Sequence, residues 1–129
     1  MSKKFLMSII LLIFMFSACK HSEGYGGLAT IKGKVFGKDF NSNGNLVSQD
    51  YIGDVDVYIS KHGETAYFDN VNSSYDGSFK FNFLYPGKYD IWVFGDCDSC
   101  SWSQTYVLKT VEIADKRAIV SVEDFIITF

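Results

Sequence analysis

Proline, histidine and cysteine are all scarce in this sequence of 129 residues, which has one proline, two histidines and three cysteines. Aromatic residues, in contrast, are plentiful, with twelve phenylalanines, eight tyrosines and two tryptophans. Disordered chains are poor in aromatic residues and are often rich in proline. The composition therefore excludes a largely disordered protein and predicts a folded hydrophobic core.

The scarcity of histidine also bears on catalysis and on metal binding. His21 falls in a predicted tether and His62 in a predicted turn, and no Ser-His-acid or Cys-His arrangement is visible around either residue. A structural zinc site needs four ligands, which these two distant histidines do not supply. We therefore predict that the protein is not an enzyme.

A block of basic residues is missing as well. Lysine and arginine together number 12 against 15 acids, the formal net charge is -3, and both signs are scattered along the chain. Nucleic acids and anionic lipids are bound by clustered positive charge. We therefore predict no nucleic-acid partner and no basic stripe for anionic lipid.

One long apolar run is present, from Phe5 to Phe16, behind two lysines. It is shorter than the roughly 20 residues that a membrane-spanning helix needs, and it ends in Phe16-Ser17-Ala18-Cys19. This end resembles the lipobox of bacterial lipoproteins, with phenylalanine in place of the more usual leucine. The resemblance implies a signal peptide over residues 1–18 and a lipid such as palmitate on Cys19.

Two alternatives for the first 18 residues stay open: a retained transmembrane anchor, and a plain secretory signal cut after Ala18. A lipidated Cys19 implies a lipoprotein of the bacterial cell envelope, held at the outer membrane, with the periplasmic or the outer side undecided. The expected partners are the membrane itself, through the lipid, and an envelope protein or a glycan. Residues 19–27 are polar and glycine-rich and are expected to form a tether, and residues 28–129 suffice for one domain.

The other two cysteines, Cys97 and Cys100, lie close together in a loop with acidic neighbours. In an oxidising compartment they can form a local disulfide, or they can stay free. Contact with a metal and a redox role are further alternatives. Negative neighbours raise a thiol pKa, which disfavours the redox role.

Apolar residues recur with period two, and no segment has a sustained helical period. In residues 78–83, for example, Phe79, Phe81 and Phe83 alternate with polar residues, so one face of that strand is expected to be buried. Leu84-Tyr85-Pro86-Gly87 has the residues of a type II turn and predicts a hairpin to the next strand. The pattern predicts an all-β, seven-stranded antiparallel β-sandwich with strands near 29–36, 55–60, 65–71, 78–83, 88–94, 104–113 and 118–127.

Several of these segments carry a family resemblance. Ile31-Lys32-Gly33-Lys34-Val35, Val55-Asp56-Val57-Tyr58-Ile59, and the succession Asp76-Gly77-Ser78-Phe79-Lys80-Phe81 followed by Leu84-Tyr85-Pro86-Gly87-Lys88-Tyr89-Asp90-Ile91 resemble the carboxypeptidase regulatory-like domain. The resemblance covers about residues 28–127. It implies a transthyretin-like (prealbumin-like) sandwich that serves as a non-catalytic module, although fold alone does not assign a function.

One loop has oxygen-bearing residues at alternate positions around a glycine. Asp39, Asn41, Asn43, Asn45 and Asp50 have the spacing of positions 1, 3, 5, 7 and 12 of a calcium loop. The loop is also similar to that of the calcium-binding B domains of serine-aspartate-repeat adhesins. A plain turn rich in asparagine and glycine is the alternative, and calcium is the one cofactor that the sequence suggests.

A second candidate site contains aromatic residues. Trp92, Trp102 and the outward-facing Tyr58 are candidates to stack on sugar rings or peptide side chains, although aromatic residues on a sheet often only cover a neighbouring strand. The sequence therefore predicts a lipid-anchored, non-catalytic structural or interaction module. A calcium-stabilised adhesin-like module and a glycan-binding accessory lipoprotein are the alternatives.

Overall fold

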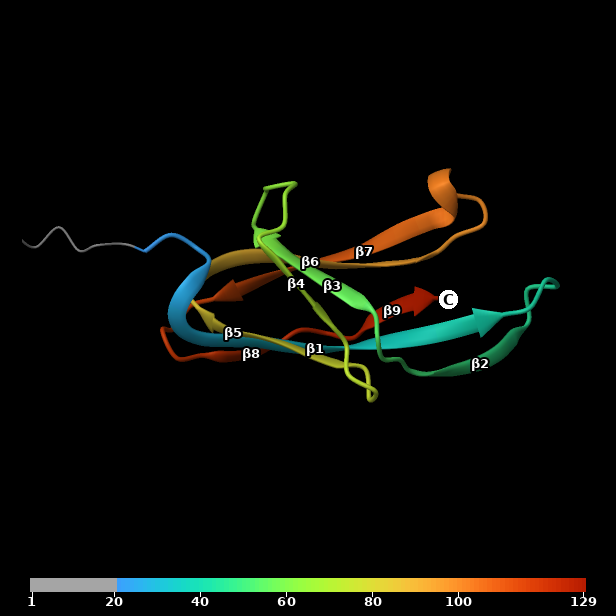
Figure 1. Ribbon diagram of the computed structural model, residues 1–129, viewed down its shortest axis with the longest axis horizontal. Helices are drawn as coiled ribbons and strands as arrows, with labels where there is room; N and C mark the ends of the chain where they lie inside the picture. Colours follow the sequence, from blue (N-terminus) through green and yellow to red (C-terminus); the bar gives the residue numbers. More distant parts are fainter. Residues whose placement is uncertain (1–20) are drawn as a thin grey trace, which may run out of the picture.

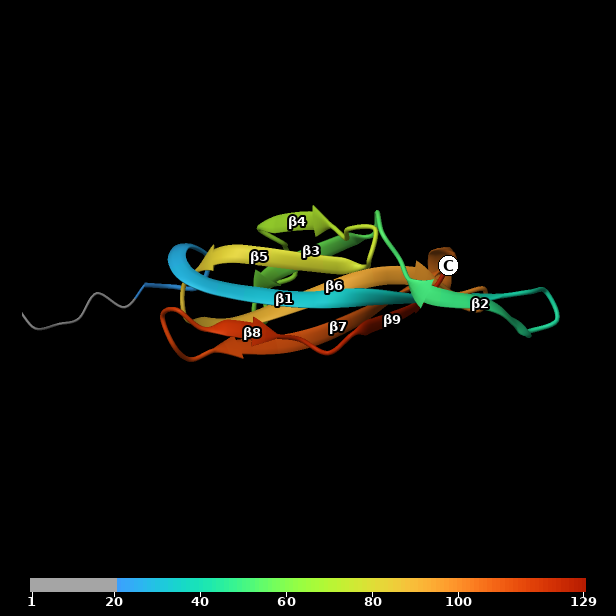
Figure 2. The ribbon, with the colours of Figure 1, turned by 90° about the horizontal axis from the view of Figure 1, so that it is seen from below.

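Two β-sheets face each other across one hydrophobic core in the computed structural model, which describes residues 21–129 (Figure 1, Figure 2). In the first sheet β2, β1 and β5 are neighbours and β8 and β9 also pair with β1; the second has the order β4-β3-β6-β7. The all-β prediction is confirmed, and none of the described residues form a helix long and apolar enough to cross a membrane. The strands are β1 (Tyr25–Phe40), β2 (Leu46–Tyr51), β3 (Asp56–Lys61), β4 (Asp69–Asn72), β5 (Ser78–Leu84), β6 (Gly87–Asp96), β7 (Gln104–Ile113), β8 (Ile119–Ser121) and β9 (Phe125–Thr128), with one 3-10 turn, η1 (Ser101–Ser103).

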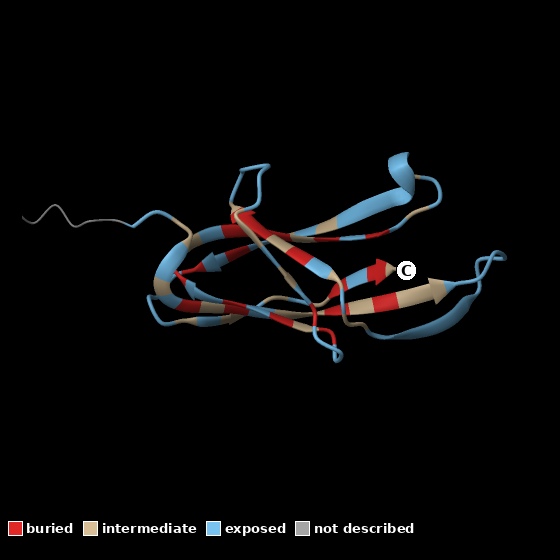
Figure 3. Ribbon diagram, viewed as in Figure 1, coloured by how far each residue is buried: buried red, intermediate tan, exposed pale blue. Residues whose placement is uncertain are grey.

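The core lies between the sheets and follows the alternation of the sequence. Figure 3 shows buried and more exposed residues alternating along the strands. Phe79 and Phe81 of β5 point inward, as predicted, but Phe83, which the alternation places on the same face, is 66% exposed. Phe83 has a φ of 61° and lies at a bulge, where three steps along β5 match two steps along β1, so the alternation is broken there. From the second sheet Ile59 and Ile91 are fully buried. The sheets are held together by this shared burial of apolar surface, the main stabilising term in folding.

The described residues form nine strands, so the predicted count of seven is wrong. One extra strand is β2, all of whose residues are exposed. The other arises where the predicted strand 118–127 divides into β8 and β9. Ser121 lies opposite Lys32 and Phe125 opposite Val35, so four steps along the C-terminal segment match three steps along β1 and the pairing is interrupted.

The first sheet is mixed, which corrects the expectation of a wholly antiparallel sandwich. Strands β8 and β9 both run parallel to β1, while β2 and β5 run antiparallel to it. Strand β1 is also longer than predicted: it begins at Tyr25, so the last three residues of the predicted tether, 25–27, belong to the strand.

The turn at Tyr85 and Pro86 does not close a hairpin, contrary to the prediction. Strand β5 pairs with β1, and β6 pairs with β3 and β7, so this turn carries the chain from one sheet to the other. The fully buried Tyr89 stabilises this connection between the sheets. Its hydroxyl donates a hydrogen bond to the Tyr85 carbonyl at 2.6 Å and accepts one from the Gly24 amide at 2.8 Å. One end of the sandwich is closed in this way.

Candidate functional site

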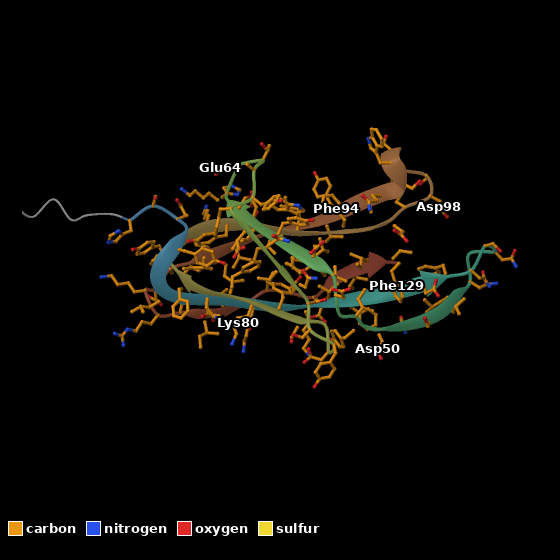
Figure 4. All side chains as sticks on the ribbon, viewed as in Figure 1. Asp50, Glu64, Lys80, Phe94, Asp98 and Phe129 are labelled. Carbon is orange, nitrogen blue, oxygen red and sulfur yellow. A yellow bond between two sulfur atoms is a disulfide. The ribbon has the colours of Figure 1, made fainter. Side chains whose placement is uncertain are left out.

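The outer face of the second sheet carries a group of aromatic side chains. Because Val57, Ile91 and Val93 point into the core, their neighbours Tyr58, Trp92 and Phe94 point outward. Strand pairing places these side chains side by side: Tyr58 is opposite Trp92, and Phe94 is opposite Tyr106 of β7. In Figure 4, Phe94 and Glu64 lie on the same side of the molecule, away from Lys80.

The rings contact one another in a continuous cluster. Tyr58 and Trp92 are stacked, with centroids 5.7 Å apart and planes 13° apart. Tyr58 also meets Tyr67 at 4.9 Å and Phe94 at 5.7 Å, both in edge-to-face contacts. Phe94 in turn meets Tyr106 at 6.4 Å. Such contacts hold large side chains in a fixed arrangement without burying them fully.

These residues line a shallow, open depression of about 540 Å³, which we call the aromatic groove. Its floor is the half-buried Tyr58 and Trp92 pair, and its rim includes Tyr67 and Tyr106, which are 53% and 61% exposed. A contiguous exposed apolar surface of this kind is typical of a binding site. The groove is lined by Tyr58, Glu64, Thr65, Tyr67, Trp92, Phe94, Tyr106 and Leu108.

The groove also offers polar groups beside the rings. Glu64 and Thr65 bring a carboxylate and a hydroxyl to one side. Burial, followed by the negative charge of Asp56 and the neighbouring Tyr67, raises the pKa of Tyr58, so its phenol stays protonated at neutral pH. A surface that combines apolar ring faces with a few hydroxyl groups suits a ligand that is itself apolar on one face and hydroxylated at its edge.

One wall of the groove is the loop between β3 and β4, and the buried Asp90 holds this loop in place. The Asp90 carboxylate accepts a hydrogen bond from the Gly63 amide at 3.0 Å and one from the Thr110 hydroxyl at 2.8 Å, and it contacts His62 Nδ1 at 2.8 Å. The fully buried Ser60 adds a bond from its hydroxyl to the Glu64 carbonyl at 3.2 Å. Asp90 is therefore a positioning residue for the groove.

Trp102, the third predicted ligand-binding residue, does not join the other two. It lies in η1, at the far end of the loop that follows β6, and is 96% exposed. In the same loop Cys97 and Cys100 are joined by a disulfide, with Cα atoms 5.3 Å apart. The structure therefore brings Tyr58 and Trp92 together and leaves Trp102 outside the groove.

The predicted calcium loop folds as the β-hairpin between β1 and β2. Asp39 lies opposite Ser48, and Asp50 lies farther along β2, opposite Gly37. The side-chain oxygen of Asn41 accepts the backbone amides of Asn43 and Asn45, both at 3.0 Å.

Asp39 and Asp50 therefore belong to the paired strands β1 and β2, while Asn41, Asn43 and Asn45 lie in the turn between these strands. In residues 21–129 no three His, Cys, Asp or Glu side chains come close enough together to hold a metal ion. Cys19 lies outside the described residues.

A solved structure has a similar fold. It belongs to a protein of Pseudomonas aeruginosa that is named a "putative carbohydrate binding protein". The two chains are 12% identical, with a TM-score of 0.51 over 84% of this chain and 92% of that one. At this identity the likeness concerns the fold alone. No family model matches the sequence, and no curated protein matches it.

Tyr67, Phe94, Tyr106 and Leu108 belong to the groove but are not among the predicted ligand-binding residues. The alternation of the sequence places three of them on the outer face of the sheet: Phe94, Tyr106 and Leu108 occupy outward positions of the predicted strands 88–94 and 104–113. What the sequence lacked was the register between strands, which brings Phe94 opposite Tyr106 and Trp92 opposite Leu108. Tyr67 belongs to the predicted strand 65–71, but β4 begins only at Asp69, so Tyr67 lies in the preceding loop.

Proposed function

We propose that this protein is a non-catalytic, lipid-anchored module of the bacterial cell envelope that binds a glycan in the aromatic groove. The observation that carries the proposal is the groove itself, where the stacked, half-buried Tyr58 and Trp92 form the floor beside Glu64 and Thr65. The faces of a sugar ring that carry C–H groups are apolar and pack on aromatic rings, while its hydroxyls reach polar side chains at the rim.

The fold of the neighbouring structure supports the proposal, because that protein is named for carbohydrate binding and has a similar arrangement of strands. The same architecture, together with the turn and alternation pattern of the sequence, underlies our proposal that residues 28–129 form a transthyretin-like domain of the carboxypeptidase regulatory-like kind. Such a domain supplies a rigid sheet on which surface residues can be displayed.

The anchor and the location rest on the sequence. We propose that residues 1–18 are removed and that Cys19 carries the lipid, which would place the domain at the outer membrane. Growth of the producing bacterium with a labelled fatty acid tests this: the wild-type protein becomes labelled and a Cys19→Ser variant does not. Absence of label from the wild-type protein would contradict the proposed lipid on Cys19.

A glycan array with the purified protein tests the main proposal. We expect retention on a defined set of oligosaccharides, and we expect Trp92→Ala to weaken it by about tenfold or more, since stacking on a central aromatic residue typically contributes more than about 1.4 kcal/mol. The control is Trp102→Ala, which removes the same side chain outside the groove and should leave retention unchanged. Equal loss in both variants, or no retention of the wild-type protein on any oligosaccharide, would contradict the proposal.

Calcium binding by the β1–β2 hairpin stays a prediction with a direct test. A ligand that binds only the folded state raises the thermal midpoint of unfolding. If calcium binds, millimolar calcium raises this midpoint in the wild type and Asp39→Ala removes the rise. An unchanged midpoint in both proteins discards the calcium site and leaves the hairpin as a turn closed by Asn41.

A further inference from the structure

The outer face of the first sheet carries positively charged lysines, whereas the aromatic groove on the second sheet is formed mainly by aromatic rings. Lys32 and Lys34 point outward from β1, and Lys80 points outward from β5, because Ile31, Phe79 and Phe81 on either side of them face the core. Together with Ser121 of β8 they line an open depression of about 580 Å³, which we call the lysine cleft. Figure 4 shows Lys80 on the side of the molecule opposite Phe94 and Glu64.

The strand register makes this arrangement costly in the absence of a ligand. Lys32 lies directly opposite Lys80 in the antiparallel pair of β1 and β5. Like charges directly opposite each other on one face of a sheet repel and destabilise it. In the described residues the ion pairs within 4.0 Å are His62 with Asp90 and Lys109 with Glu123, so neither Lys32 nor Lys80 has a carboxylate partner there.

Two carboxylates near these lysines accept hydrogen bonds from neutral hydroxyl groups and keep their negative charge, without forming an ion pair within 4.0 Å with Lys32 or Lys80. Asp124, which also lines the cleft, accepts a hydrogen bond from the Tyr51 hydroxyl at 2.7 Å. The Asp76 carboxylate accepts the Ser78 hydroxyl at 2.6 Å. The ammonium group of Lys34 lies 4.6 Å from the centre of the Tyr51 ring. In the described residues Lys32 and Lys80 are the cleft lysines that have neither an ion pair nor a cation–π contact.

This patch is a local feature, because the chain as a whole is acidic with a net charge of -3. The scattered charges of the sequence predicted no basic cluster. The cluster arises because positions 32 and 34 share one face of β1 and the register adds position 80 from a distant strand.

We propose that the lysine cleft binds the phosphate group of an anionic ligand. An anion placed between Lys32 and Lys80 would turn their repulsion into two charge-assisted contacts, with hydroxyl groups such as that of Ser121 donating further hydrogen bonds. Lysine is well suited to this role because its ammonium group acts as a compact point charge with three donors. The proposal is independent of glycan binding, since the cleft and the aromatic groove lie on opposite faces of the sandwich.

The test uses the purified chain and inorganic phosphate, with sodium chloride at equal ionic strength as the reference. We expect phosphate to shift the backbone amide resonances of residues 32, 34, 80 and 121, and to raise the denaturant midpoint of the wild type. In a Lys32→Gln/Lys80→Gln variant both effects should disappear, with phosphate affinity lowered about tenfold for each lysine removed.

Two matched variants separate specific binding from a general salt effect. Lys80→Gln alone should raise the midpoint without phosphate, because it removes the opposed charge, whereas Lys88→Gln on β6 should behave as the wild type in every arm. A third arm compares binding to vesicles of phosphatidylglycerol with binding to vesicles of phosphatidylcholine. This comparison shows whether a lipid headgroup is a better source of the phosphate than inorganic phosphate. Binding to either source that depends on Lys32 and Lys80 supports the proposal. An equal phosphate response in the wild type and the double variant, or no response in the wild type to phosphate and to both vesicles, would overturn the proposal.

Discussion

Replacing Asp90 with alanine should lower the free energy of unfolding by about 2–4 kcal/mol, because it leaves three hydrogen-bonding groups without their partner. Asp90 is only 7% exposed, and its carboxylate joins the Gly63 amide, His62 and the Thr110 hydroxyl. Denaturant unfolding followed by circular dichroism measures the change. Glu112→Ala removes an exposed acid from the neighbouring β7 and should cost less than about 0.5 kcal/mol. Similar losses in the two variants would contradict the role assigned to Asp90.

The same residue predicts a dependence of stability on pH. Burial alone would raise the pKa of Asp90, but the hydrogen bonds from His62, Gly63 and Thr110 outweigh it and hold this pKa below its usual range. Because the folded pKa lies below the unfolded value of about 3.9, the stabilisation is complete above roughly pH 5 and is lost as the pH falls through 4 and below. The wild type should therefore lose stability in this range more steeply than Asp90→Asn.

Replacing Phe81 with alanine should have a larger effect than the same change at Phe83, two residues along the same strand. Phe81 is 1% exposed and packs in the core, so its loss leaves a cavity and should cost about 3–5 kcal/mol. Phe83 is 66% exposed, and its replacement should cost less than about 1 kcal/mol. The two variants are compared by denaturant midpoint. Equal effects would contradict the burial of Phe81 and the exposure of Phe83 at the bulge of β5.

The parts of the fold that the sequence predicts are those where burial alternates. Burial alternates over most of β3, β5 and β6, apart from the buried Ser60 and Asp90 and the exposed Phe83, and the predicted segments 55–60, 78–83 and 88–94 overlap these strands closely. The outward direction of Tyr58 and Trp92 follows from the same alternation, so the sequence predicts the floor of the aromatic groove.

The features that were missed depend on pairing between distant segments. Strand β2 is exposed along its whole length, so it has no burial pattern, and the sequence pattern instead assigns its Asp50 to a candidate calcium loop. The parallel pairing of β8 and β9 with β1 is set by the tertiary fold, and the local β propensity of these residues does not predict it. The opposition of Lys32 and Lys80 likewise appears only once the register is known.

The two outer faces of the sandwich display side chains of different kinds. The second sheet displays rings with few charges, and the first displays lysines, while the shared core holds both faces in a fixed relation. Under the two proposals above, the sandwich contacts different ligands on its opposite faces. The glycan proposal is the more direct of the two, because the groove is already assembled by ring contacts in the free protein.

The most direct measurement of the glycan proposal uses the two tryptophans as separate reporters. The chain has two tryptophans, so an ¹⁵N-correlation spectrum of the labelled protein contains two indole signals, which Trp92→Ala and Trp102→Ala assign. On titration with an oligosaccharide selected by the array, the account predicts that the Trp92 indole signal shifts in a saturable way and that the Trp102 signal stays in place. A shift of the Trp102 signal alone, or no shift of either signal with every oligosaccharide tested, would contradict the account.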